Sequence, residues 1–213
     1  MASFSSRGGP GQSLGISKPD VTAPGVQILA GNTPLAVPGG QLFQAIAGTS
    51  MSGPHVAGAG AMMVALHPNW TPGQIKSALM TTAVTSTVKE DGVTPTDAFD
   101  DGSGRIDLRR SPDPLFTIDE TAANYVALKS ELFKANYPSL YVPALAGQLT
   151  VQRTLKSVSS RTQYYGVTVK SDKGLRVWVS SPFFSLRPGA SKTLNITVDG
   201  RDIPLGETRF ATV

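Results

Sequence analysis

Apolar and polar positions follow two different patterns along this chain, and the change falls near residue 112. Before it, apolar residues gather in short runs or recur every three to four positions. After it, they alternate with polar residues, as in residues 150–155. Helical spacing indicates packed helices, whereas a period of two indicates strands with one buried face. We therefore expect an α/β region followed by an all-β region.

The first region contains one stretch, residues 52–66, that is apolar on every side and carries no Asp, Glu, Lys or Arg. Such a helix is typically buried. Residues 58–61 are Gly-Ala-Gly-Ala, which leaves one side nearly bare and favours close packing against a sheet. Short apolar runs at residues 26–30 and 41–46 predict strands. The expected fold is α/β, with a buried helix packed on a parallel sheet.

A second helix has clear start signals. Thr71 is the expected N-cap, Pro72 occupies the first helical position, and Gln74 can close a capping box back to Thr71. Apolar residues then recur at helical spacing from Ile75 onwards. We expect this helix to run through Ala83.

The second region shows short alternating runs separated by turn residues, for example at residues 171–174 and 187–189. This arrangement is typical of an antiparallel β-sandwich. The prolines in Ser111-Pro112-Asp113-Pro114 stiffen the chain just before the pattern changes. The predicted organisation is an α/β domain over residues 1–112, a linker over 113–135 and a sandwich over 136–213.

Composition narrows the range of functions. The chain has 213 residues, no cysteine and a formal net charge of +4. The absence of cysteine removes disulfides, thiol catalysis and cysteine-based zinc sites. The basic surplus is spread singly along the second region, which favours a solvated β surface over a nucleic-acid partner. No apolar run reaches eighteen residues, so we expect no membrane span.

The strongest candidate for chemistry is Ser50, in the run Gly-Thr-Ser-Met-Ser-Gly-Pro-His-Val-Ala-Gly at residues 48–58. Proline is tolerated only in the first helical turn, so Pro54 places the helix start close by and Ser50 at or just before it. Backbone N–H groups and the positive end of the helix dipole favour negative charge there. An attacking hydroxyl would find donors for its oxyanion. The alternative is an ordinary serine N-cap.

Residues 48–58, together with residues 4–8 and 18–26, resemble the subtilisin-like serine proteases (subtilases, the peptidase S8 family). One extra glycine, in Gly8-Gly9-Pro10, departs from the family pattern. The resemblance implies a serine endopeptidase with Ser50 as nucleophile, Thr49 and Met51 as substrate-binding neighbours, a peptide or protein substrate, and an extracellular location. Similarly, residues 136–139 resemble the start of the fibronectin type III-like domain that follows many subtilase catalytic domains.

The same resemblance indicates missing parts. In subtilases the triad runs Asp, His, Ser along the chain, yet the forty-nine residues before Ser50 contain neither family segment. His55 lies about 140° around a helix from Ser50, and His67 about 25 Å along it. Neither can act as its base. We expect the chain to be the C-terminal part of a longer protease, truncated in its sandwich and inactive alone. Its partner would be the missing N-terminal part of the catalytic domain.

No cofactor is required by the implied chemistry. Four aspartates between residues 97 and 107 leave calcium binding open, but their spacing fits no EF-hand loop. A solvated loop is the favoured interpretation.

Two other functions were weighed against proteolysis. In the first, the chain is a binding or structural module whose sandwich docks a partner. In the second, the 213 residues form a complete non-enzymatic product. The second would leave the helix at residues 52–66 with a large apolar surface in water, and we expect the isolated chain to aggregate.

Overall fold

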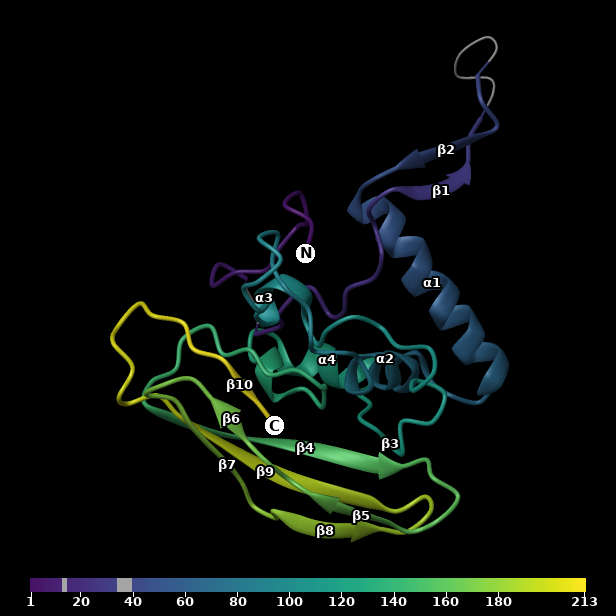
Figure 1. Ribbon diagram of the computed structural model, residues 1–213. Helices are drawn as coiled ribbons and strands as arrows, with labels where there is room; N and C mark the ends of the chain where they lie inside the picture. The colour runs from purple at the N-terminus through teal and green to yellow at the C-terminus, as the bar shows by residue number, and fades with distance from the viewer. Residues whose placement is uncertain (13–14, 34–39) are drawn as a thin grey trace.

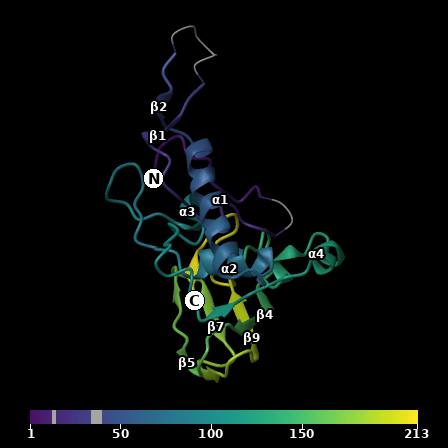
Figure 2. The same ribbon diagram turned by 90° about the vertical axis from the view of Figure 1, so that its right-hand side faces the viewer.

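The computed structural model describes residues 1–12, 15–33 and 40–213, and they form two regions that lie one above the other (Figure 1). The upper region holds a β-hairpin and the α-helices, and the lower region is made of antiparallel strands. The view turned by 90° shows α1 (Thr49–Leu66) standing above α2 (Pro72–Thr81), with the strands of the lower region below both (Figure 2). The predicted change from helical to strand periodicity is therefore confirmed.

The upper region begins with a hairpin that projects beyond the end of α1 (Figure 1). β1 (Ile28–Gly31) pairs antiparallel with β2 (Phe43–Ile46). Both strands were predicted from their apolar runs and are slightly shorter than expected. Among the described residues, parallel pairing occurs only as the isolated bridge between Thr22 and Arg105.

The longest helix, α1 (Thr49–Leu66), has 18 residues, of which only Ala59 and Met63 are buried. Met62 and Leu66 are each more than half exposed, at 54% and 55%. The expectation of a helix buried on all sides is therefore wrong for the chain as the structure describes it. The expected apolar surface in contact with water is present.

The second helix, α2 (Pro72–Thr81), begins as predicted. The Thr71 side chain accepts from the Gln74 N–H at 3.1 Å, and the Gln74 side chain accepts from the Thr71 N–H at 3.1 Å. The helix ends two residues earlier than expected. Two of its buried residues, Ala78 and Leu79, form one core cluster with Ile106 and the buried residues of α1, and Val21 and Val56 pack against this cluster.

Residues 113–135, which the sequence suggested as a linker, contain β3 (Phe116–Thr117), α4 (Ala122–Leu128) and the 3₁₀-helix η1 (Leu132–Lys134). β3 pairs with β4 (Gln148–Ser157) of the lower region. The backbone N–H of Ile118 donates to the Ser77 hydroxyl of α2 at 2.8 Å, in a buried position. This segment therefore touches both regions.

The lower region is a sandwich of two antiparallel sheets around a core of Ile118, Leu155, Leu186 and Leu194. One sheet has the strand order β3-β4-β9-β7 and the other pairs β5 with β8, while β6 and β10 form a separate short pair. The bounds are β4 Gln148–Ser157, β5 Gln163–Gly166, β6 Lys170–Ser171, β7 Arg176–Val179, β8 Phe183–Leu186, β9 Ser191–Asp199 and β10 Ala211–Thr212. This arrangement agrees with the predicted antiparallel β-sandwich.

Candidate functional site

Ser50 lies in the first turn of α1, and its residue is exposed to solvent. The N-cap is Gly48, which supplies no side-chain oxygen to the helix. Ser50 is therefore not the N-cap. The first turn of α1 holds no acidic residue, so the unpaired N–H groups at this end keep their positive character.

Pro54 lies further inside the helix than the sequence suggested. The helix begins at Thr49, five residues before Pro54, so the expectation that it starts close to the proline is wrong. Proline has no N–H and cannot donate to the carbonyl four residues earlier. That carbonyl belongs to Ser50. The turn that carries the candidate nucleophile is thus less tightly bonded than a regular helix.

A contact with Gly25 holds this turn from the other side. The N–H of Gly48 donates to the Gly25 carbonyl at 2.8 Å. A Cβ atom on Gly25 would lie 2.2 Å from the Ser52 Oγ and 2.8 Å from the Gly48 carbonyl oxygen. Only glycine allows the two segments to approach this closely. The sequence analysis did not predict this role, although Gly25 ends an Ala-Pro-Gly triplet that is typical of a turn.

Both histidines bond to backbone carbonyls. The Nδ1 atom of His55 lies 2.8 Å from the carbonyl oxygen of Met51, to which it donates. The residue is hydrogen-bonded as expected, but it is exposed and not packed. His67 follows the far end of α1, where its Nε2 bonds to the Pro112 carbonyl at 2.9 Å. Its ring stacks on Trp70 with 3.8 Å between ring centroids.

The two predicted neighbours of Ser50 have different environments. Thr49 is exposed at the first position of α1, whereas Met51 is half-buried. The N–H of Met51 donates to the Gly48 carbonyl at 3.0 Å, which tightens the start of the helix. The two residues thus flank Ser50 on the open end of the helix.

The aspartates near residue 100 are not a solvated loop, and that expectation is wrong. Asp100 and Asp101 are buried in the short helix α3 (Ala98–Asp101). Lys89 and Arg7 bind Asp100 at 3.0 and 3.2 Å, and the hydroxyls of Thr87 and Thr96 donate to Asp101. Burial raises the pKa of Asp100, but the bonds from the Asp97 backbone and Lys89, together with the charges of Lys89 and Arg7, outweigh it and lower the pKa.

The described residues hold no group of three or more His, Cys, Asp or Glu arranged for a metal ion. Nor do they include a helix long and apolar enough to cross a bilayer.

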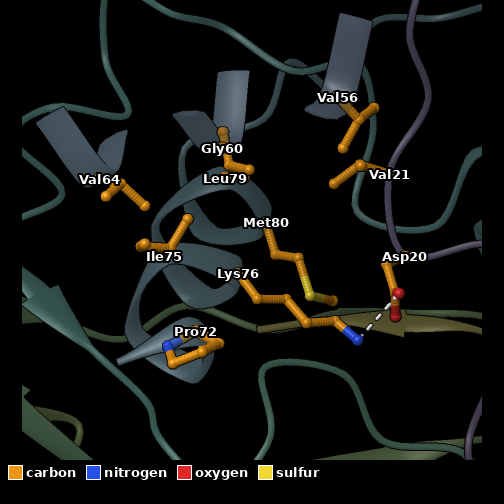
Figure 3. A pocket seen from close by; sticks show the side chains of 10 residues that line it. All are labelled: Asp20, Val21, Val56, Gly60, Val64, Pro72, Ile75, Lys76, Leu79 and Met80. Atoms are coloured by element: carbon orange, nitrogen blue, oxygen red, sulfur yellow. Dashed lines mark ion pairs between the residues drawn. The ribbon is translucent and has the colours of Figure 1, made fainter. Parts of the chain in front are cut away.

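A cavity of about 410 Å³ opens between α1 and α2 (Figure 3). Its walls are mainly apolar, with Val56 and Val64 from α1 facing Ile75 and Leu79 from α2. The ion pair between Lys76 and Asp20 lies at one edge. Ser50 does not line it, so this cavity is separate from the candidate catalytic serine.

The profile of the subtilase family matches residues 1–107, which is half of the chain. The chain belongs to the subtilase family. A fibronectin type-III profile matches residues 134–213, so a subtilase segment is followed by that domain.

Several plant subtilases match nearly the whole chain. Subtilisin-like protease SBT1.6 of Arabidopsis thaliana is 33% identical over 254 residues, covering 98% of this chain and 33% of the relative. SBT3.5 and SBT5.4 of the same plant are 32% and 34% identical, covering 92% and 84% of the chain. The chain spans about a third of the length of these relatives.

Proposed function

We propose that Ser50 is the nucleophile of a serine endopeptidase. Its position carries the proposal: an exposed hydroxyl in the first turn of an uncharged helix, inside the segment that matches the subtilase family. The Oγ atom attacks a peptide carbonyl, a base takes the hydroxyl proton and passes it to the leaving amine, and water then hydrolyses the acyl-enzyme. The helix N-terminus and the Ser50 N–H stabilise the developing oxyanion.

The base and its orienting carboxylate come from residues outside these 213. Support comes from the two histidines, because His55 is bonded to the backbone and His67 lies past the other end of the helix. Without a base, a serine hydroxyl stays protonated and is a weak nucleophile. The chain alone is therefore catalytically incomplete. The same outside residues, the N-terminal part of the catalytic domain, cover the exposed face of α1.

Thr49 and Met51 contact the substrate, a peptide or protein, on either side of the attacked bond. Thr49 is exposed beside the nucleophile, and Met51 presents a half-buried side chain next to it. The whole protease acts outside the cell, as the family resemblance implies.

The reaction needs no cofactor, and calcium does not bind the aspartates near residue 100. Protein donors already satisfy these carboxylates: Lys89, Arg7 and two threonine hydroxyls. A calcium ion would have to displace them. Addition of calcium or of a chelator should leave the melting temperature of the 213-residue chain unchanged, and a calcium-dependent rise would contradict this assignment.

The test of the nucleophile uses the whole protein that contains this chain. Ser50→Ala should lower kcat for a fluorogenic peptide by up to about 10⁶-fold, the scale found when a subtilisin nucleophile is removed. Ser52→Ala is the matched control, because Ser52 lies in the same turn but packs toward Gly25. This control should keep measurable turnover. Full activity of the Ser50→Ala variant would refute the proposal.

A docking role for the sandwich is a second candidate, favoured by two exposed aromatic side chains. Tyr164 and Phe183 are 84% and 82% exposed, and the strand register places them on the same face of the β5–β8 pair. Exposed aromatic clusters mark interaction surfaces. Replacing both by serine should raise KM for a protein substrate without changing KM for a short peptide. If the double variant and the wild type had the same KM for the protein substrate, this result would argue against docking.

A further inference from the structure

The two regions meet at a hydrogen bond between side chains 117 positions apart in sequence. The Tyr137 hydroxyl donates to one carboxylate oxygen of Asp20. The other oxygen of Asp20 binds the Nζ atoms of Lys18 at 2.6 Å and Lys76 at 2.9 Å. The Lys76 Nζ also lies 4.6 Å from the centre of the Tyr137 ring. The link therefore joins a phenol of the sandwich side to a carboxylate of the subtilase side.

The sandwich holds Tyr137 firmly. Arg153 of β4 is buried, at 4% exposure, and its guanidinium donates to the carbonyls of Tyr137 at 2.6 Å, Phe133 at 3.0 Å and Ser139 at 3.1 Å. Within the described residues Arg153 makes no ion pair, so its side-chain bonds all go to backbone carbonyls. Burial lowers the pKa of Arg153 to about 10. A guanidinium used in this way fixes the segment around Tyr137.

On the other side, Asp20 begins the short segment that supports the candidate nucleophile. The carbonyl of Asp20 accepts from the Ser103 N–H at 2.9 Å, which anchors it in the subtilase region. Five residues further, the Gly25 carbonyl accepts from the Gly48 N–H at 2.8 Å, two positions before Ser50. Between these two anchors, the Thr22 N–H donates to the Gly104 carbonyl at 2.9 Å and the Thr22 carbonyl accepts from the Ile106 N–H at 3.0 Å, so the segment from Asp20 to Gly25 is fixed to the subtilase region along its length.

We propose that Tyr137 is a positioning residue for Ser50, acting through its hydrogen bond to Asp20 and the segment from Asp20 to Gly25. The fibronectin type III domain then helps to set the geometry of the nucleophile. This inference rests on the proposed function of Ser50. Hydrogen bonds to charged groups are among the stronger ones in proteins, and misplacement of a reacting group by about 1 Å costs up to 10²-fold in rate.

The hydroxyl can be tested apart from the ring. Tyr137→Phe keeps the ring and its contact with Lys76 but removes the bond to Asp20. Tyr141→Phe is the matched control, because the Tyr141 hydroxyl donates to the Pro10 carbonyl at 2.8 Å and so also crosses between regions. Pro10 precedes Lys18 in the sequence, so this bond lies outside the segment from Asp20 to Gly25.

The measurement is made on the whole protease, with kcat and KM for a short peptide, the rate of Ser50 labelling by a fluorophosphonate, and the melting temperature. We expect Tyr137→Phe to lower kcat and the labelling rate about tenfold with KM within about twofold. Tyr141→Phe should leave the two rates unchanged. Unchanged rates in Tyr137→Phe, or equal losses in both variants, would overturn the proposal.

A double-mutant cycle with Asp20→Ala, which removes the acceptor oxygen, guards against a general loss of stability. If both residues act through one bond, adding Tyr137→Phe to Asp20→Ala should cause no further loss of kcat. Additive losses would contradict the inference. Absence of labelling in the wild-type protease would overturn the proposed function and this inference together, whereas normal wild-type labelling with no effect of Tyr137→Phe would overturn this inference alone.

Discussion

The subtilase region and the fibronectin type III domain of this chain differ in how far they bury their apolar side chains. In the sandwich, alternate residues of β4 and β9 enclose a core in which Leu155 and Leu194 are each 6% exposed. In the subtilase region, α1 has 18 residues and buries two of them. Burial of apolar surface is the main force that stabilises a fold. The sandwich therefore carries its own core, whereas α1 needs a further surface to cover it.

The largest expected effect concerns that uncovered helix. Replacing Met62 by Glu and Leu66 by Lys places a favourable i,i+4 pair on the exposed face of α1. The 213-residue chain should associate in its wild-type form and become monomeric in this variant, as measured by light scattering. In the whole protease, the same variant should lose activity if the N-terminal part of the catalytic domain covers this face, as we propose.

The control for this variant is Val126→Lys on α4, a single exposed apolar residue at 77%. It should not change the association of the chain, because isolated apolar residues on a surface are ordinary. If the wild-type chain stayed monomeric and melted cooperatively, the conclusion that α1 needs a further surface to cover it would be wrong.

The sandwich core should show the next largest effect. Leu194→Ala removes a buried side chain and should lower the free energy of unfolding by about 2–5 kcal/mol in a urea titration. Leu205→Ala is the control, because Leu205 is fully exposed. It should change the free energy by less than about 0.5 kcal/mol. Equal effects of the two substitutions would mean that the core lies elsewhere.

A smaller effect is expected at the start of α2. Thr71→Ala removes the acceptor for the Gln74 N–H and the donor to Asp119, and should cost about 1 kcal/mol of stability. Thr71→Ser retains the hydroxyl and should recover most of this loss. Thermal melting of the three proteins provides the comparison, and an unaltered melting temperature in Thr71→Ala would contradict the capping box.

These local features explain which parts were predictable. The α2 cap depends on Thr71, Pro72 and Gln74, which lie within four positions of one another, and the structure confirms it. The sandwich strands follow a simple alternation. By contrast, the predicted start of α1 was wrong. A proline is unfavourable inside a helix, yet Pro54 lies five residues after the first residue of α1.

The interactions that sequence reasoning missed join distant positions. Asp100 is neutralised by Lys89 and Arg7, and the latter lies far away in sequence. Nothing in the spacing of the aspartates shows which cations meet them, so burial and partners could not be predicted. The bond between Tyr137 and Asp20 is of the same kind. Interactions between neighbouring residues could therefore be predicted from the sequence, whereas contacts between the two regions could be found only in the structure.

The smallest expected effect is the pH dependence of the link between the regions. Burial opposes ionisation of Asp20, but bonds from Lys18, Tyr137 and Lys76 outweigh it and lower its pKa below the ordinary value of 3.8. The folded state then favours the carboxylate. Its contribution to stability is complete above pH 3.8 and is lost as the pH falls through the lower folded pKa.

The free energy of unfolding of the chain should therefore fall as the pH falls through this acid range, and it should fall less in Asp20→Asn than in the wild type. An identical decline in both proteins would show that Asp20 is not held as a carboxylate by its three partners.

Labelling of Ser50 by a fluorophosphonate, located by mass spectrometry, tests the central account most directly. If α1 presents the Ser50 hydroxyl correctly but the base lies outside the chain, the fluorophosphonate should label Ser50 rapidly in the whole protease. It should not label the 213-residue chain in the same time. Rapid labelling of the chain alone, or an unlabelled Ser50 in the whole protease, would contradict this account.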